Sequence, residues 1–171
     1  MIMLISTEEL HQILNDNNIL VVDSRSYKEY SQGHIPGAVN LDLFAFHWVD
    51  TSEEGIISFN EQMRNLLSYA GIDETKKVIF YDNVSGMLAA RGVWLCLYFS
   101  HPNVFMLNGG LKKWIAEKLD IETKSSIFNP TNFTTPINAS ILVGAQYVEK
   151  SIGKAIIIDA RSPEEFDGRI A

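Results

Sequence analysis

The residues most able to do chemistry in this 171-residue chain follow short apolar runs. Asp82 comes directly after residues 78–81 and begins a polar loop, while Asp23 and Arg25 follow residues 19–22. Continuous apolar runs of this length are typical of strands that are buried on both faces of a sheet. An aspartate and an arginine two residues apart can form a charge-assisted pair. We expect Asp23 and Arg25 to support the scaffold at the end of a strand rather than to bind a substrate.

Two further polar side chains could act as acid–base or binding groups. His34 stands in a turn just before Pro36 and Gly37. We expect its ring to fix this loop by hydrogen bonds, and general-base catalysis is the alternative. Arg91 lies one helical turn or more beyond the loop that Asp82 begins. We expect Arg91 to bind a carbonyl or a carboxylate such as that of Asp82.

Cys96 is the only cysteine, which excludes an internal disulfide and a cysteine-based metal site. It lies in the apolar stretch 92–99, and a cysteine in an apolar helix is usually a small buried hydrophobe with a raised pKa. We therefore expect Cys96 to pack in the core. No metal and no cofactor are expected.

Strands alternate with helices along most of the chain. Capping boxes at residues 6–9 and 26–29 predict two helix starts. Residues 43–59 are predicted to form an aromatic-rich, irregular segment. The remaining predicted elements are strands at residues 19–22, 38–41, 78–81 and 104–107 and helices at residues 61–70, 87–99 and 111–117. This alternation predicts an α/β fold with a parallel sheet flanked by helices on both faces.

The chain begins to repeat itself near its C-terminal end. Residues 156–166 match residues 20–30 at one constant offset, including the Asp-x-Arg-Ser-x-x-Glu pattern, which indicates duplicated units. The stretch between the repeats is rich in Thr, Ser and Asn, contains prolines and predicts an extended linker. We therefore expect a complete domain at 1–119, a linker at 120–139 and the opening of a second domain at 140–171, with a helix at 145–150, a strand at 155–158 and a capping box at 162–165.

Composition and charge narrow the range of partners. Apolar residues make up 46% of the chain and charged residues 20%, as in a globular domain. A net charge of −7 without long charge runs argues against nucleic acid or an anionic membrane as a partner. No secretory signal is visible and no apolar stretch reaches the length of a membrane span, so we expect a cytoplasmic protein.

Several motifs, in a fixed order, resemble those of rhodanese-type sulfurtransferases. They are Asp23-Ser-Arg25, the run from Tyr30 to Leu41 with its His-Ile-Pro-Gly-Ala, the loop from Tyr81 to Met87, Ala90-Arg91 with Trp94, and the run from Leu107 to Trp114. The resemblance covers residues 1–119 and restarts near residue 140. The duplication resembles the two-domain thiosulfate and 3-mercaptopyruvate sulfurtransferases, whose first domain is usually inactive and whose second domain carries sulfur as a cysteine persulfide.

The resemblance implies that the loop that Asp82 begins is a degenerate active-site loop. The family places its cysteine straight after a central strand, where backbone N–H groups converge at a helix N-terminus and lower the thiol pKa. Here that position holds Asp82, which suits the positive helix end but is no sulfur nucleophile. No catalytic residue is expected in this domain. The degenerate loop comprises Asp82, Asn83, Val84, Ser85, Gly86 and Met87, and the expected structural motif comprises Asp23, Arg25, His34, Pro36, Gly37 and Arg91.

Two departures from family patterns exclude or weaken other activities. The same fold serves phosphatases that use Cys-x5-Arg, but Pro102 stands where that arginine would follow Cys96. Relatives of the mercaptopyruvate type often carry a substrate-binding arginine where this chain has Glu165, although Arg169 lies close by. The resemblance therefore implies no phosphatase activity and leaves the carboxylate-binding arginine in doubt.

Two interpretations of function stay open. In the favoured interpretation, the chain is the N-terminal part of a two-domain sulfurtransferase. It is shortened either by design or by a truncated reading frame. Its partner is then the missing second rhodanese domain, which the aromatic segment 44–48 would face, and a small sulfur donor binds only the complete enzyme. A homodimer formed through the truncated repeat is a further possibility. In the alternative, the chain is an inert rhodanese-like module that binds a partner protein, with residues 140–171 as an embracing tail.

Overall fold

The computed structural model describes residues 4–47 and 50–170. Trp48, the last residue of the aromatic segment, lies outside the described residues. The chain divides into two compact units, Met1–Asn138 and Ala139–Ala171. Each unit is described by itself.

The first unit is built on a five-stranded parallel sheet with the strand order β1-β5-β4-β2-β3. The strands at residues 19–23, 77–81 and 104–107 confirm the apolar runs predicted as buried strands. The strand predicted at residues 38–41 forms at residues 39–40. The register places Asp23 of β2 beside Tyr81 of β4, so the carboxyl ends of the two central strands are level. The strands are β1 (Leu4–Ile5), β2 (Ile19–Asp23), β3 (Val39–Asn40), β4 (Lys77–Tyr81) and β5 (Val104–Leu107).

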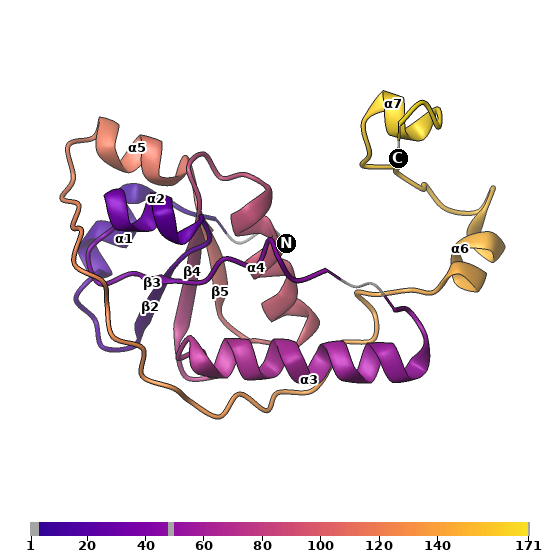
Figure 1. Ribbon diagram of the computed structural model, residues 1–171, viewed down its shortest axis with the longest axis horizontal. Coiled ribbons are helices and arrows are strands. Elements are labelled where there is room, and N and C mark those ends of the chain that lie inside the picture. The colour runs from indigo at the N-terminus through magenta and orange to yellow at the C-terminus, as the bar shows by residue number, and fades with distance from the viewer. Residues whose placement is uncertain (1–3, 48–49, 171) are drawn as a thin grey trace. The chain divides into compact units, whose positions relative to one another are not determined.

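Helices cover both faces of this sheet, as predicted (Figure 1). On one face, Leu10 of α1 and Trp114 of α5 join a buried cluster with strand residues such as Ile79. On the other face, α4 approaches so closely that a Cβ at Gly92 would lie 2.3 Å from the ring of Phe80. The helices of the first unit are α1 (Thr7–Ile13), α2 (Tyr27–Gln32), α3 (Glu53–Tyr69), α4 (Met87–Tyr98) and α5 (Gly110–Ala116).

Helix α3 is longer than the sequence predicted. It begins at Glu53 rather than near residue 61, so the prediction of an irregular segment through residue 59 is wrong. Ser52 caps the helix by accepting the Gly55 N–H, and Glu53 and Glu54 favour the positive end of the first turn. These signals outweigh the helix-weakening Gly55 and the two isoleucines that follow it.

The segment predicted as a linker is extended and belongs to the first unit (Figure 1). Its Phe133 is only 2% exposed, and the Phe133 N–H donates to Ser68 Oγ at 3.0 Å. Nearby, the Thr131 N–H donates to the Ser68 carbonyl of α3 at 2.9 Å. We refer to residues 120–138 as the extended segment, which packs against the domain and contributes Phe133 to its core.

The second unit contains α6 (Ala145–Ser151) and α7 (Pro163–Phe166). Helix α7 starts at a complete capping box between Ser162 and Glu165, as predicted. The strand predicted at residues 155–158 is not formed. A strand exists only through hydrogen bonds to a neighbour, and no neighbouring strand pairs with these residues in the described part of the chain.

No helix in the described ranges is both long and apolar enough to cross a membrane.

Candidate functional site

The loop after β4 ends at the N-terminus of α4 and folds around the side chain of Asp82. This carboxylate is almost fully buried and accepts N–H groups from three later residues. Val84 donates to Oδ1 at 2.9 Å, Gly86 donates to both oxygens at 2.8 and 3.0 Å, and Ala89 donates to Oδ2 at 3.1 Å. Converging backbone N–H groups at a helix N-terminus form an anion site. In this protein the anion is supplied by the chain itself.

Helix α5 holds the loop from its other side. The carbonyl of Asp82 accepts the Leu111 N–H at 2.8 Å, and the carbonyl of Asn83 accepts the Lys112 N–H at 3.0 Å. This approach requires a glycine at position 110, because a Cβ there would lie 2.5 Å from the Asp82 carbonyl oxygen and φ is +59°. The Leu-Asn-Gly-Gly motif therefore serves to dock α5 on the degenerate loop.

The loop's other polar side chains are also bonded. Ser85, in the left-handed region at φ 66°, donates its hydroxyl to the Leu107 carbonyl at 2.8 Å. Asn83 donates its amide to Glu29 Oε1 at 3.0 Å, and the pKa of Glu29 is lowered by its hydrogen bonds to Ser26 and Asn83. Val84 and Met87, by contrast, are 55% and 68% exposed. The loop thus presents apolar side chains outward and keeps its polar groups bonded.

Asp23 and Arg25 form the expected ion pair, and both are buried. Arg25 Nε and Nη2 reach the two Asp23 oxygens at 2.9 and 2.6 Å. Tyr81 donates its hydroxyl to Asp23 Oδ2 at 2.7 Å. Burial disfavours the charged form of Arg25, but the hydrogen bond and charge of Asp23 outweigh it and raise the pKa of Arg25. Burial also raises the pKa of Tyr81, which stays a hydrogen-bond donor.

The loop with His34, Pro36 and Gly37 is held by the main chain and by the extended segment. His34 Nδ1 lies 2.8 Å from the Tyr30 carbonyl, and its ring stacks on that of Tyr30 at 3.7 Å between centroids. Glu122 pairs with the His34 backbone in a β-bridge, and its carboxylate accepts the Gly37 N–H at 2.6 Å. His34 is fully buried.

Sequence reasoning missed two contributors to this region. Glu122 lies far away in the sequence and carries no motif. Asn40 donates its amide to the carbonyls of Asp23 and Arg25 at 3.0 and 2.8 Å. The sequence offers one signal for Asn40, an amide side chain in the short strand that follows the His-Ile-Pro-Gly motif.

Arg91 does not reach the carboxylate of Asp82. Its guanidinium donates to the Phe46 carbonyl instead. The sequence predicted either a carbonyl or a carboxylate as the partner of Arg91, and the partner is a carbonyl. Cys96 faces the core of the domain and is fully buried, as expected, and burial raises the pKa of its thiol. The structure therefore brings Asp23, Arg25 and the His34 loop together, and it leaves Cys96 apart from the degenerate loop.

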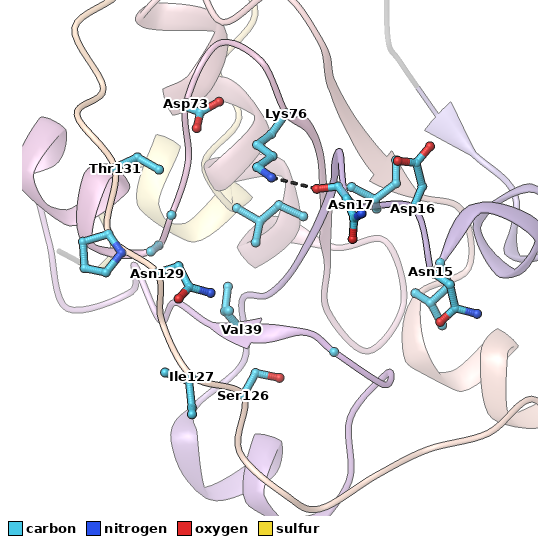
Figure 2. A pocket seen from close by; sticks show the side chains of 17 residues that line it. Asn15, Asp16, Asn17, Val39, Asp73, Lys76, Ser126, Ile127, Asn129 and Thr131 are labelled. Atoms are coloured by element: carbon cyan, nitrogen blue, oxygen red, sulfur yellow. Dashed lines mark hydrogen bonds between the residues drawn. The ribbon is translucent and has the colours of Figure 1, made fainter.

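A cavity of about 550 Å³ lies at the other end of the strands from the Asp82 loop, where the strands begin (Figure 2). It is lined by Asn17, Lys76 and Asp73 among others, and Lys76 Nζ donates to the Asn17 carbonyl at 2.7 Å. A second, apolar cavity of about 80 Å³ lies beside Arg91 and Trp94. Within residues 4–47 and 50–170, no cluster of three His, Cys, Asp or Glu side chains could hold a metal ion.

The fold, the His-Ile-Pro-Gly loop and the loop at the carboxyl end of β4 define a rhodanese domain. The chain belongs to the rhodanese family, since the model of the rhodanese-like domain matches residues 6–117.

Curated relatives are sulfur-handling proteins. The chain is 28% identical over 174 residues to the sulfur carrier protein TtuD of Thermus thermophilus, covering 98% of this chain and 60% of that protein. It is 34% identical over 146 residues to the putative thiosulfate sulfurtransferase SseA of Mycobacterium tuberculosis, covering 82% and 47%. It is 29% identical to the thiosulfate sulfurtransferase of Pseudomonas aeruginosa, covering 97% and 62%. The chain thus spans roughly half to three fifths of the length of these relatives.

Among solved structures, the chain is similar to SseA of Escherichia coli, described as a 3-mercaptopyruvate sulfurtransferase with the rhodanese fold. The TM-score is 0.80 at 26% identity, and the match covers 99% of this chain and 70% of that one. A probable thiosulfate sulfurtransferase matches with a TM-score of 0.70 at 22% identity, over 91% of this chain and 63% of its own, which supports the fold alone.

Proposed function

We propose that residues 1–119 form the non-catalytic N-terminal rhodanese domain of a two-domain sulfurtransferase. The complete enzyme moves sulfane sulfur from thiosulfate or 3-mercaptopyruvate to a thiophilic acceptor through a cysteine persulfide on its second rhodanese domain. Residues 140–171 are the opening of that second domain. The observation that carries the proposal is the buried Asp82 carboxylate, which fills the N–H nest of the loop after β4.

Sulfur transfer explains why Asp82 makes this loop inert. A thiolate attacks the sulfane sulfur of thiosulfate, the sulfur–sulfur bond breaks and sulfite leaves with the bonding pair. The acceptor then attacks the outer sulfur of the persulfide and restores the thiolate. A carboxylate cannot form the persulfide. Its negative charge also opposes an anionic donor, and its oxygens already use the N–H groups that would hold one.

The surface around the loop suits a protein partner better than a small anion. Val84 and Met87 project into solvent, and Phe44 of the aromatic segment is 54% exposed. Two arginines of this region are engaged elsewhere, Arg25 with Asp23 and Arg91 with the Phe46 carbonyl. Exposed apolar side chains that lie together in one loop, such as those of Val84 and Met87, are typical of an interaction site, and we assign this surface to the second rhodanese domain.

Reading the gene beyond codon 171 tests this proposal directly. We expect an open frame that encodes a second His-x-Pro-Gly motif and a cysteine after the next central strand. The protein made from that longer frame should turn over thiosulfate or 3-mercaptopyruvate, and replacing the downstream cysteine by serine should abolish turnover. A stop codon without such a cysteine would instead favour the inert module that binds a partner protein.

A further inference from the structure

His34 has a buried ring nitrogen that makes no hydrogen bond within the described residues. The imidazole is fully buried, and its Nδ1 lies 2.8 Å from the Tyr30 carbonyl. Because a carbonyl oxygen only accepts, Nδ1 must carry a hydrogen, and the neutral ring then has a lone pair on Nε2. This Nε2 is the buried nitrogen without a partner. A buried acceptor in this state is costly, and a proton at Nε2 with an acceptor in reach would remove the cost.

A carboxylate faces this nitrogen. Oε1 of Glu122 lies 3.7 Å from His34 Nε2, which is beyond hydrogen-bond distance. While the ring is neutral, both atoms are acceptors and nothing draws them together. A proton on Nε2 would turn the same pair into a charge-assisted hydrogen bond, and a shortening by about 1 Å would bring it to the usual length of such a bond.

Glu122 is also the residue that attaches the beginning of the extended segment to the His34 loop. Its N–H donates to the His34 carbonyl and its carbonyl accepts the His34 N–H, both at 2.9 Å. Its carboxylate accepts the Gly37 N–H at 2.6 Å. A hydrogen bond from His34 Nε2 would therefore add a side-chain attachment at the point where the main chains are already paired.

The other charged and titratable groups around the ring are engaged. Tyr30 of α2 stacks on the ring. Arg25, which donates to the carbonyl of the residue before His34, is balanced by Asp23. Tyr81 of β4 donates its hydroxyl to the same aspartate. Burial opposes a charged ring, and the carboxylate of Glu122 favours it.

We propose that His34 and Glu122 form a proton-dependent ion pair. Uptake of one proton from solvent by Nε2 closes the bond to the Glu122 carboxylate and fastens the extended segment to the His-Ile-Pro-Gly loop. Histidine titrates between about pH 5 and 8, where carboxylates are still ionised, so the attachment is stronger in mild acid than at neutral pH. Both residues lie in the first unit, so the inference does not depend on the proposed function.

The first test follows the ring nitrogens of His34 by NMR in the 171-residue chain labelled with nitrogen-15 in its histidines. We expect Nδ1 to stay protonated and Nε2 to gain a proton as the pH falls from about 8 to about 5. Glu122→Gln keeps an acceptor for the Gly37 N–H but removes the charge, so Nε2 should bind its proton about tenfold more weakly. The matched control is Glu8→Gln, which removes an exposed carboxylate of α1 and should leave the titration unchanged.

Hydrogen exchange measures the attachment itself. The protection factor of the Glu122 amide, which is relative to the intrinsic exchange rate at each pH, should rise several-fold between pH about 7.5 and about 5.5. It should stay level in Glu122→Gln. The Thr131 amide, which donates to the Ser68 carbonyl farther along the extended segment, should show no such rise.

Three results would overturn the inference. They are an Nε2 that stays unprotonated down to pH about 5, a titration that Glu122→Gln leaves unchanged, and a rise in protection as large at Thr131 as at Glu122. The first and the third are measured on the unchanged chain, so they decide the question even if a variant fails to fold.

Discussion

Gly86 donates its backbone N–H to both carboxylate oxygens of Asp82, at 2.8 and 3.0 Å. These two bonds close the loop after β4 around the carboxylate of Asp82, which lies four residues before Gly86 in the chain. A loop built to hold an anion thus remains intact while its own side chain occupies it. The loop therefore keeps the N–H nest of an anion site with an aspartate carboxylate inside it.

Replacing Asp82 by cysteine should create a reactive thiol. In the Cys96→Ser background, Asp82→Cys would place a sulfur within reach of the N–H groups of Val84, Gly86 and Ala89. These donors favour the thiolate, so the thiol pKa should fall below the ordinary value of about 8.5. The pH dependence of alkylation by iodoacetamide measures it.

The matched control for this thiol is Asp16→Cys in the same background. Asp16 is exposed and accepts a single backbone N–H, that of Asn18. Its cysteine should titrate close to the ordinary pKa. Equal pKa values at the two positions would show that the loop does not act as an anion site.

The extended segment should contribute to the stability of the domain through Phe133. This ring is 2% exposed and meets Phe99 edge-on at 6.1 Å between centroids. Phe133→Ala should lower the free energy of unfolding by about 3 kcal/mol. Phe128→Ala, in the same segment but half-buried, should lower it by only about 1 kcal/mol. Urea denaturation measures both, and losses of the same small size would mean that the segment behaves as a free linker.

His101 should make the domain less stable in mild acid. Its Nε2 lies 2.8 Å from the Asp73 carbonyl and its Nδ1 accepts the Asn103 N–H at 3.1 Å, which fixes the neutral ring. Burial lowers the pKa of His101 from its ordinary value. The stabilisation is therefore present above the unfolded pKa of about 6.5 and is lost as the pH falls through the lower folded value.

Urea denaturation at pH about 7.5 and about 5.5 tests this pH dependence. His101→Gln should reduce the difference in unfolding free energy between the two conditions. His11→Gln replaces an exposed histidine and should leave that difference unchanged. A loss on acidification that His101→Gln does not reduce would assign the effect to other groups.

The sequence predicted the elements whose signals are local. Buried strands appeared as apolar runs, helix starts as capping boxes, and the Asp23–Arg25 pair as a two-residue spacing. The same pair forms between Asp159 and Arg161 without a surrounding sheet, which shows that it is encoded by its own short motif. Family resemblance drew attention to the loop that begins at Asp82, and the N–H groups that its carboxylate accepts hold that loop in shape; that the loop is degenerate stays a prediction.

The features that could not be predicted depend on distant contacts. Strand β1 is two residues long and exists through pairing with β5. Glu122 contacts the His34 loop and Phe133 packs in the core, and no periodic pattern in the sequence predicts either contact. At residues 155–158 the converse holds, because strong β-propensity predicted a strand and none of the described residues pairs with it.

The most direct test of the central claim is sulfur loading of the 171-residue chain itself. The chain would be incubated with thiosulfate or 3-mercaptopyruvate, examined by mass spectrometry for a protein persulfide, and assayed for thiocyanate formation with cyanide. We predict no added sulfur and no turnover above that of the Cys96→Ser variant. A persulfide or turnover that disappears in Cys96→Ser would contradict the account, because it would make the buried Cys96 a sulfur carrier.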